Sequence, residues 1–341
     1  MKFLISFCNV GYLSKQHCLG VYDWEKHHLD YVALPLENLQ IDYQKVGGTT
    51  GLIQVETNYF VILQSKYPYV LCLDSELNVI HCQGLELVKD PHSLAFHEGY
   101  LYIVSTGNNS IVRLPYNDKF GEEELHLRLD EAHSDQIHLN SLAFFEHQLI
   151  VSCFGMKGRN NLIRNGYIKN VYANQILLEG IREPHSLINY NNALYVLESV
   201  TGCLYKIIPG QDCQLLQEFS GYARGLVFDD NDIFIVRNAR RKLSRQLGGK
   251  KHAPLRDITA EICEWQHSWI CRSKFEENTY EKKDFTAFGF EVYDIVPMIS
   301  EPNPANLVKD GVIHRILCYE EFCAELQHQL KVLQGSKSQS N

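Results

Sequence analysis

Residues 90–105, DPHSLAFHEGYLYIVS, contain two runs of alternating apolar residues on either side of a turn at Glu98-Gly99. The two-residue period is that of a β-strand, and so short a connection predicts a β-hairpin. The same pattern occurs in four further segments, at residues 49–63, 138–153, 183–198 and 222–237. Every copy has a Leu with another large apolar residue seven positions later, and the pairs are Leu52 and Tyr59, Leu94 and Leu101, Leu142 and Leu149, Leu187 and Leu194, and Leu226 and Ile233.

The repeat also has a regular length, because the five Leu residues lie 42, 48, 45 and 39 residues apart. Further strand-like segments follow most of the hairpins, for example SIVRLPY at 110–116 and LHLRLDE at 125–131. Four strands in each unit of this length are typical of a β-propeller blade. One blade cannot bury both of its faces, so blades stack on their neighbours and close into a ring.

The two ends of the chain supply the strands of a sixth blade. FLISF at 3–7, HCLGVYDWE at 17–25 and HHLDYVALPL at 27–36 form three strands without an innermost one, and FEVYDIVPM at 290–298 is a lone strand. The sequence therefore predicts an all-β, six-bladed propeller over residues 1–300, closed by both chain ends. An extension at 301–341 is expected to contain a helix at about 319–334.

The composition excludes several classes of protein. The net charge is −9 over 341 residues, so electrostatic binding of nucleic acid over the whole surface is not expected. No apolar run is long enough to cross a membrane, and no phosphate-loop or dinucleotide-binding motif occurs, so neither a membrane nor a nucleotide cofactor is expected. The 11 Cys residues include no CxxC pair, which favours free thiols in the cytoplasm. We expect a monomer or a weak homo-oligomer.

The segment PHSLAFHEGYLYIVSTGNNSIVRL at 91–114 resembles NHL-type repeats and the related gluconolactonase, strictosidine-synthase and virginiamycin-lyase propellers. ARGLVF at 223–228, CEW at 263–265 and EVYDIVP at 291–297 are similar to a family of uncharacterised bacterial propellers. The resemblance covers residues 45–300 and implies the fold. The related families hydrolyse lactones, catalyse condensation or elimination, or only bind, so the resemblance leaves the activity open. The calcium-binding Glu, Asn, Asn and Asp of gluconolactonases are not visible at matched positions.

Polar residues recur two positions before each repeated Leu, where the innermost strand of a blade begins at one mouth of the channel. These residues are Thr50, His92, Asn140, His185 and Arg224. The sixth position is Glu291 if Tyr293 takes the place of the Leu, and otherwise Asp294.

Three interpretations of this ring remain open at the level of sequence. His92, His185 and Glu291 can bind a divalent metal such as Zn, Mn, Fe or Ni. Alternatively, one His is a general base and the other an acid, because the ordinary pKa of His is near neutrality. In the third interpretation each His only stabilises the contact between blades. Arg224 is expected to pair with a carboxylate or phosphate of the substrate.

The ends of the second strands are expected at the same mouth. Glu198 and Arg237 lie on the alternating phase that is apolar within the strands, where the first copy has Leu63, so they form either an ion pair between blades or part of a site. A basic segment at 240–256 leaves the strand that ends near Arg237, and it is either a solvated loop or a lid that attracts anions. Cys153 is expected to be a buried residue without a catalytic role.

The leading hypothesis is a non-redox enzyme, of the lyase, hydrolase, cyclase or isomerase type. It acts on a small anionic metabolite at the mouth of the propeller channel, with or without one divalent metal ion. The predicted catalytic residues are His92, His185 and Glu198. The predicted substrate-binding residues are Thr50, Asn140, Arg224, Arg237, Asn108 and Arg240. The alternative is a non-catalytic propeller that binds a ligand or a protein partner.

Overall fold

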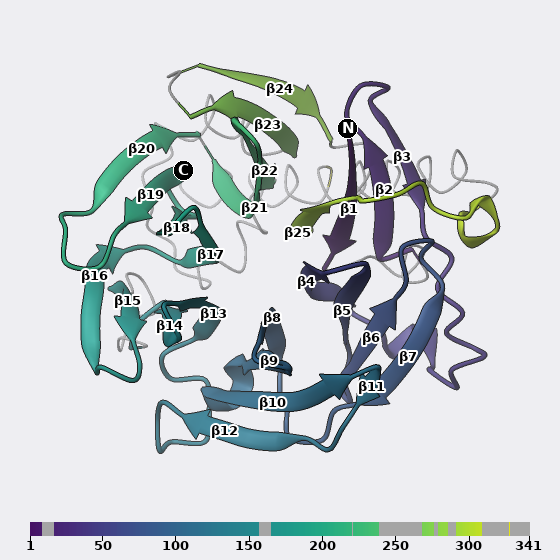
Figure 1. Cartoon of the computed structure of the whole chain (residues 1–341), viewed down its shortest axis with the longest axis horizontal. Helices are drawn as coiled ribbons and strands as arrows, with labels where there is room; N and C mark the ends of the chain where they lie inside the picture. Colours follow the sequence, from purple (N-terminus) through teal and green to yellow (C-terminus); the bar gives the residue numbers. More distant parts are fainter. Residues whose placement is uncertain are drawn as a thin grey trace, which may run out of the picture.

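The computed structural model describes residues 1–8, 17–156, 165–219, 221–238, 268–275, 279–285, 291–308 and 327. Six antiparallel sheets, five of four strands and one of five, are arranged around a central axis (Figure 1). The predicted six-bladed β-propeller is therefore confirmed. The described residues contain no helix that is long and apolar enough to span a membrane.

The five repeats of the sequence are the first two strands of five blades, as predicted. Blade 1 consists of β4 (Gly48–Val55), β5 (Asn58–Gln64), β6 (Tyr69–Leu73) and β7 (Val79–Gly84). Blade 2 consists of β8 (Pro91–His97), β9 (Tyr100–Ser105), β10 (Ser110–Asn117) and β12 (Glu124–Arg128), with the short β11 (Lys119–Phe120). Blade 3 consists of β13 (Leu139–Phe145), β14 (Gln148–Cys153), β15 (Gly166–Asn170) and β16 (Gln175–Ile181).

The remaining blades follow the same order, with the innermost strand given first. Blade 4 consists of β17 (Pro184–Tyr190), β18 (Ala193–Glu198), β19 (Cys203–Ile207) and β20 (Gln214–Glu218). Blade 5 consists of β21 (Tyr222–Asp229), β22 (Asp232–Asn238), β23 (Trp269–Lys274) and β24 (Tyr280–Asp284). Blade 6 consists of β25 (Val292–Pro297), β1 (Lys2–Phe7), β2 (Leu19–Asp23) and β3 (His28–Tyr31). Short 3-10 helices are η2 (Tyr43–Lys45), η3 (Thr106–Asn108) and η4 (Pro304–Asn306).

The ring is closed by the two ends of the chain. β25 pairs antiparallel with β1, and Ile295 lies opposite Ile5. The N-terminal segment is thus a strand of blade 6, as the sequence predicts. Closure gives blade 6 the same four-stranded form as its neighbours and leaves no innermost position of the ring empty.

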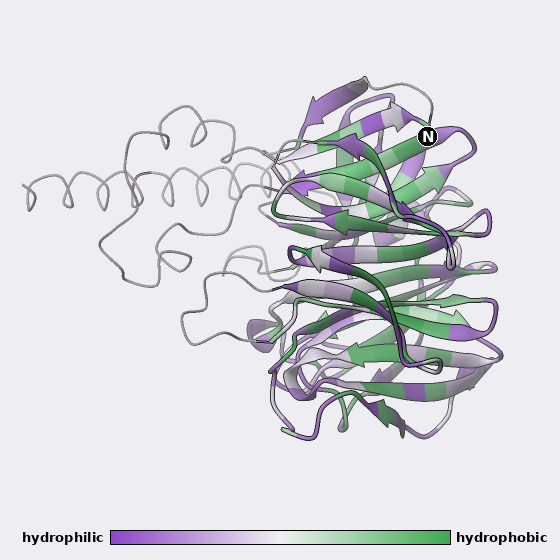
Figure 2. Ribbon diagram, turned by 90° about the vertical axis from the view of Figure 1, so that its left-hand side faces the viewer, coloured by the Kyte–Doolittle hydropathy of each residue, from purple (hydrophilic) through white to green (hydrophobic). Residues whose placement is uncertain are grey.

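Each interface between blades is filled by apolar side chains from both of them. Phe60 of blade 1 packs in one buried cluster with Leu94 and Leu101 of blade 2, and Val104 of blade 2 does so with Leu142 of blade 3. Figure 2 shows hydrophobic residues along the strands and hydrophilic residues at their turns. The alternating pattern of the repeats is therefore the pattern of burial between stacked sheets.

Some sequence-based predictions fall on residues outside the described ones. These are the basic segment at 240–256, which includes Arg240, and the helix expected at 319–334, of which only Gln327 is described. The boundary at residue 300 stays a prediction. Residues just beyond it lie against blade 6, because Leu307 forms a β-bridge with Val32.

Candidate functional site at one end of the central channel

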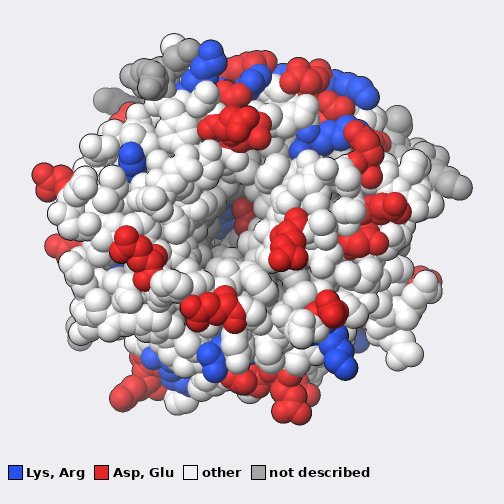
Figure 3. All heavy atoms as spheres, viewed as in Figure 1, with Lys and Arg blue, Asp and Glu red and all other residues white. Residues whose placement is uncertain are grey.

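The six innermost strands line a cavity of about 620 Å³ on the propeller axis. The cavity wall reaches Val55, His97 and Phe228, near the ends of these strands. Figure 3 shows this face, where a central hollow leads into the molecule and charged atoms are visible at its bottom. At the other end the wall begins at Ser93 and Ser186, which directly follow two of the predicted ring histidines. The residues predicted to form the ring therefore lie just beyond this end of the cavity wall, which we call the inner end.

Seven side chains from five blades contact one another in a closed circuit, which we call the channel ring. The distances between ring centroids are Tyr293–His92 5.8 Å, His92–His138 5.1 Å, His138–Phe154 4.2 Å, Phe154–His185 5.2 Å and His185–Tyr222 5.8 Å. Arg224 completes the circuit, because its guanidinium carbon lies 5.2 Å from the ring centroids of both Tyr222 and Tyr293.

The sequence correctly pointed to three members of the channel ring, but it missed the other four. His138 and Tyr222 stand four residues before the repeated Leu of their blades, so the position at minus four was the signal. In the other copies that position is Gly48, Asp90 or Glu183, which hides the pattern.

Both histidines of the PHS segments are held by a contact with their own turn. Nδ1 of His92 lies 3.0 Å from the carbonyl oxygen of Asp90, and Nδ1 of His185 lies 2.9 Å from that of Glu183. A carbonyl oxygen can only accept, so Nδ1–H is the donor and the lone pair of each neutral imidazole is on Nε2. Ser199 reinforces this arrangement, because its Oγ lies 2.7 Å from Nδ1 of His185.

Burial lowers the pKa values of both imidazoles. The pKa of His92 is lowered to about 4. The pKa of His185 is lowered well below its ordinary value by burial and by the nearby Arg224 guanidinium. The expectation of pKa values near neutrality was wrong, because it ignored desolvation of the charged form. Both side chains are neutral bases at pH 7, and either can act as an acid only after it has taken up a proton.

Arg224 forms a buried ion pair with Glu291, in which Nη1 lies 2.6 Å from Oε1. Glu291 is therefore the sixth of the polar residues predicted two positions before the repeated Leu, and Asp294 lies on the cavity wall. Burial raises the pKa of Asp294 to about 7. The ion pair balances the charge of Arg224 inside the protein, which changes the role expected for it. A guanidinium that already has a carboxylate partner is a weaker anchor for a charged substrate.

The metal site expected from His92, His185 and Glu291 is not assembled. Among the described residues, these three do not bring their ligand atoms together within 4.8 Å of one another. The physical reason is that Glu291 is bound to Arg224, while the Nδ1 atoms of both histidines face backbone carbonyls.

Three buried polar atoms of the inner end have no hydrogen-bond partner among the described residues. They are the amide nitrogen of Asn140, Nε2 of His185 and Nε of Arg224. They belong to blades 3, 4 and 5, which are neighbours. A buried polar group without a partner costs about 1–3 kcal/mol, so such groups are rare and need an explanation.

The other predicted substrate-binding residues have structural partners. Thr50 donates its hydroxyl to the carbonyl of Pro91 at 3.0 Å, which joins blades 1 and 2. Asn108 accepts from the hydroxyls of Ser105 and Ser110, both at 2.6 Å, and so fixes the turn after β9.

The prediction for Glu198 and Arg237 needs correction. The partner of the Glu198 carboxylate is Arg182, whose Nε lies 2.9 Å away, and Tyr205 donates to its other oxygen at 3.3 Å. Arg237 is buried and packs closely over Gly221, where a Cβ would meet its Nε at 1.8 Å. Glu198 is thus held by Arg182, from the segment that joins blades 3 and 4, and by Tyr205 of its own blade instead of by a side chain from blade 5.

Cys153 is buried, and burial raises its pKa to about 12. The thiolate that a nucleophilic role requires is therefore absent at neutral pH. This agrees with the expectation of a buried residue without a catalytic role.

Comparisons with known proteins show the fold. A family described as "Domain of unknown function (DUF4915)" matches residues 129–265. No curated protein matches the chain in sequence. A chain of the nidogen/laminin complex is similar with a TM-score of 0.56 at 9% identity, over 88% of this chain and all of that chain.

Two further solved structures are similar with lower scores. A putative 6-phosphogluconolactonase from Bacteroides fragilis has a TM-score of 0.47 at 10% identity, over 86% of this chain and 97% of that one. The calcium-binding protein regucalcin from Agrobacterium tumefaciens has a TM-score of 0.47 at 13% identity, over 69% of this chain and 73% of that one. At these identities the likeness shows the propeller fold alone, and a family of unknown function matches part of the chain.

Proposed function

We propose that the chain is a non-redox enzyme that removes a proton from a small carbonyl substrate, or from the water that attacks it, at the inner end of the channel. The observation that supports this most directly is the set of three buried polar atoms without partners. Nε2 of His185 can only accept a hydrogen bond, whereas the Asn140 amide and Nε–H of Arg224 can only donate. A ligand that satisfies all three has one acidic proton and one oxygen acceptor.

This combination corresponds to a general base beside an oxyanion site. His185 is neutral at pH 7, so the lone pair on its Nε2 can accept a proton from the substrate. The Asn140 and Arg224 donors stabilise the negative charge that develops on the carbonyl oxygen. Hydrolysis of an ester or lactone, or proton abstraction next to a carbonyl, both need these two elements.

The charge of the ring limits the substrate. The Arg224–Glu291 pair has no net charge, and both ring imidazoles of the PHS segments are neutral. The ring therefore favours a carbonyl compound with at most one anionic group over a multiply charged metabolite. The adjoining cavity has a volume of about 620 Å³, which is large enough to admit a small carbonyl compound.

The test is a panel of small esters, lactones and hydroxy acids, with turnover followed by NMR and binding followed by the shift in melting temperature. Asn140→Leu keeps the volume and removes the donor, so we expect kcat to fall about 10²–10³-fold. His185→Phe keeps a ring beside Phe154 and removes the base, so we expect a loss of about 10²–10⁴-fold.

The matched control is His126→Phe, because Nε2 of His126 lies 2.9 Å from the Tyr172 hydroxyl on the outer part of the propeller. It should leave turnover unchanged. Turnover that survives both ring variants, with the fold intact by circular dichroism, would contradict the proposal. Binding without turnover that also survives both variants would favour the alternative of a non-catalytic scaffold.

A further inference from the structure

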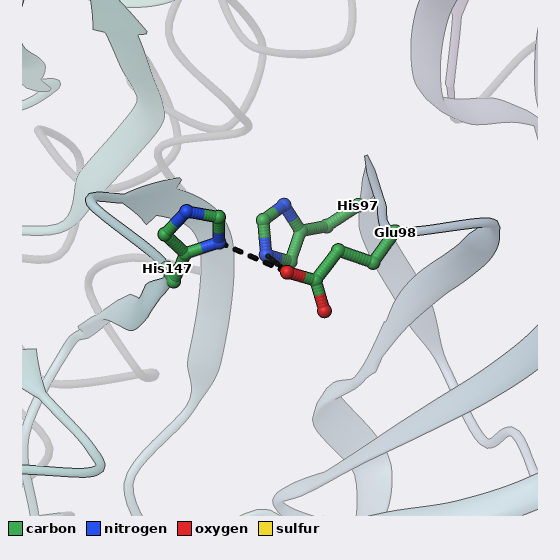
Figure 4. A group of neighbouring side chains, drawn as sticks. All are labelled: His97, Glu98 and His147. Atoms are coloured by element: carbon green, nitrogen blue, oxygen red, sulfur yellow. Dashed lines mark hydrogen bonds and ion pairs between the residues drawn. The ribbon is translucent and has the colours of Figure 1, made fainter.

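Outside the channel ring, two imidazoles and a carboxylate meet at the other end of the cavity. These are His97, Glu98 and His147, which we call the mouth triad, and their ligand atoms all lie within 4.8 Å of one another (Figure 4). Nδ1 of His147 lies 2.9 Å from Oε1 of Glu98, and Nε2 of His97 lies 3.5 Å from the same oxygen. We propose that the mouth triad binds a divalent transition-metal ion of the Zn²⁺ class at the open end of the cavity.

The fold brings the three residues together from two blades. His97 ends β8, Glu98 is the first turn residue of blade 2, and His147 is the second turn residue of blade 3. Both turns have only two residues between their strands, and their backbones are left-handed, with φ of 48° at Glu98 and 60° at His147. Turns of this kind prefer Asn and Gly. The short turns fix the position of each side chain relative to its strand.

Packing against a neighbouring blade orients the imidazole of His97 without a bound metal. Its imidazole stacks on Phe144 of blade 3, with ring centroids 4.1 Å apart and planes inclined by 16°. The side chain also lines the cavity, so the triad stands where the cavity opens. Glu98 and His147 are exposed, which allows an ion to reach them from solvent.

The distances suit a small ion with nitrogen and oxygen ligands. Tetrahedral Zn²⁺ with bonds of about 2.0–2.1 Å has ligand atoms about 3.3 Å apart. The observed separations of 2.9 and 3.5 Å bracket that value. Two of three donors are imidazole nitrogens, which suit Zn²⁺, Co²⁺, Ni²⁺ or Cu²⁺, whereas Ca²⁺ and Mg²⁺ prefer oxygen. Three protein ligands leave a position for water or for a ligand in the cavity.

The site is independent of the channel ring. It is formed by the hairpin turns, while the ring is formed by residues at the beginning of the innermost strands, and no residue belongs to both. A metal at the mouth therefore adds a function beyond that proposed for the ring. It links blades 2 and 3 and holds a Lewis acid at the entrance of the cavity.

The experiment is a Zn²⁺ titration of the full chain, produced without a histidine tag and dialysed against a chelator, in competition with a chromogenic zinc indicator. We expect one equivalent of Zn²⁺ to bind. His147→Asn keeps a residue that tolerates the left-handed turn, and Glu98→Gln keeps the side-chain shape. Each should weaken binding at least about 10-fold, and the double variant should abolish it.

The matched control is His28→Asn, because Nε2 of His28 contacts Asp30 at 2.9 Å, a comparable imidazole–carboxylate pair without a second imidazole in a metal-binding group. It should leave the affinity unchanged. The Co²⁺ form distinguishes this site from thiolate sites, since it should lack a sulfur-to-metal charge-transfer band. No stoichiometric binding, unchanged affinity in the double variant, or a thiolate band would each overturn the proposal.

Discussion

The two ends of the central cavity both contain histidines, but they place them in opposite environments. At the inner end, His92 and His185 are buried in the channel ring beside a paired Arg224 and Glu291. At the mouth, His147 is exposed on a two-residue turn and contacts Glu98. Burial keeps the inner imidazoles neutral at pH 7, so their Nε2 lone pairs carry no proton, whereas the exposed turn lets an ion from solvent reach the imidazole of His147.

The difference arises from the geometry of a propeller. Residues at the beginning of the innermost strands converge on the axis, so their side chains pack against one another and lose contact with water. Turn residues at the other end point out of the sheets, and only neighbouring turns come within reach of each other. The comparison therefore predicts that inner-end substitutions affect stability strongly, while those at the mouth affect it little.

The largest effect is expected from breaking the buried ion pair. Glu291→Ala leaves the Arg224 guanidinium buried without its carboxylate, so we expect a loss of about 3–5 kcal/mol in the free energy of unfolding, measured with urea. The double variant Arg224→Met, Glu291→Leu removes both charges and should recover most of the loss. A single variant as stable as the wild type would mean that the inner end is hydrated, and the contrast with the mouth would fail.

An intermediate effect is expected from His92. Its pKa is lowered to about 4 in the folded protein and is near 6.5 when unfolded, so between these values only the unfolded chain takes up the proton. Neutral His92 therefore contributes to the free energy of unfolding in full above pH 6.5. The free energy of unfolding falls by at most about 1.4 kcal/mol per pH unit as the pH is lowered from 6.5 towards 4. His92→Gln should flatten the pH dependence of the unfolding free energy over that window. An unchanged slope would contradict the burial of a neutral imidazole there.

The smallest effect is expected at the mouth without metal. Glu98 and His147 are exposed, and surface pairs of this kind contribute about 0–1 kcal/mol. The double variant Glu98→Gln, His147→Asn should therefore have a free energy of unfolding within about 0.5 kcal/mol of that of the wild type in the presence of a chelator. A larger loss would show that the pair stabilises the interface of blades 2 and 3 by itself. A difference that appears only with Zn²⁺ would sharpen the contrast between the two ends.

Much of the fold was predictable because each blade repeats one pattern of local residues. Alternation along the strands and the turn residues between them mark the hairpins of five blades. The three strands near the N-terminus and the single strand at 290–298 together supply the four strands of the sixth blade. The site was less predictable. The position two before each Leu pointed to His92, His185 and Arg224, because equivalent positions in a closed ring must converge. It did not reveal that Glu291 neutralises Arg224 or that Arg182 binds Glu198.

The sequence by itself determined the hairpin repeat, the number of blades and the closure of the ring, since these depend on spacing along the chain. Only the tertiary structure decided how side chains of different blades pair. His97 and His147 are 50 residues apart and become neighbours because two turns stand side by side. Burial likewise depends on what packs around a group, so it was the closed ring that made His92 and His185 neutral bases.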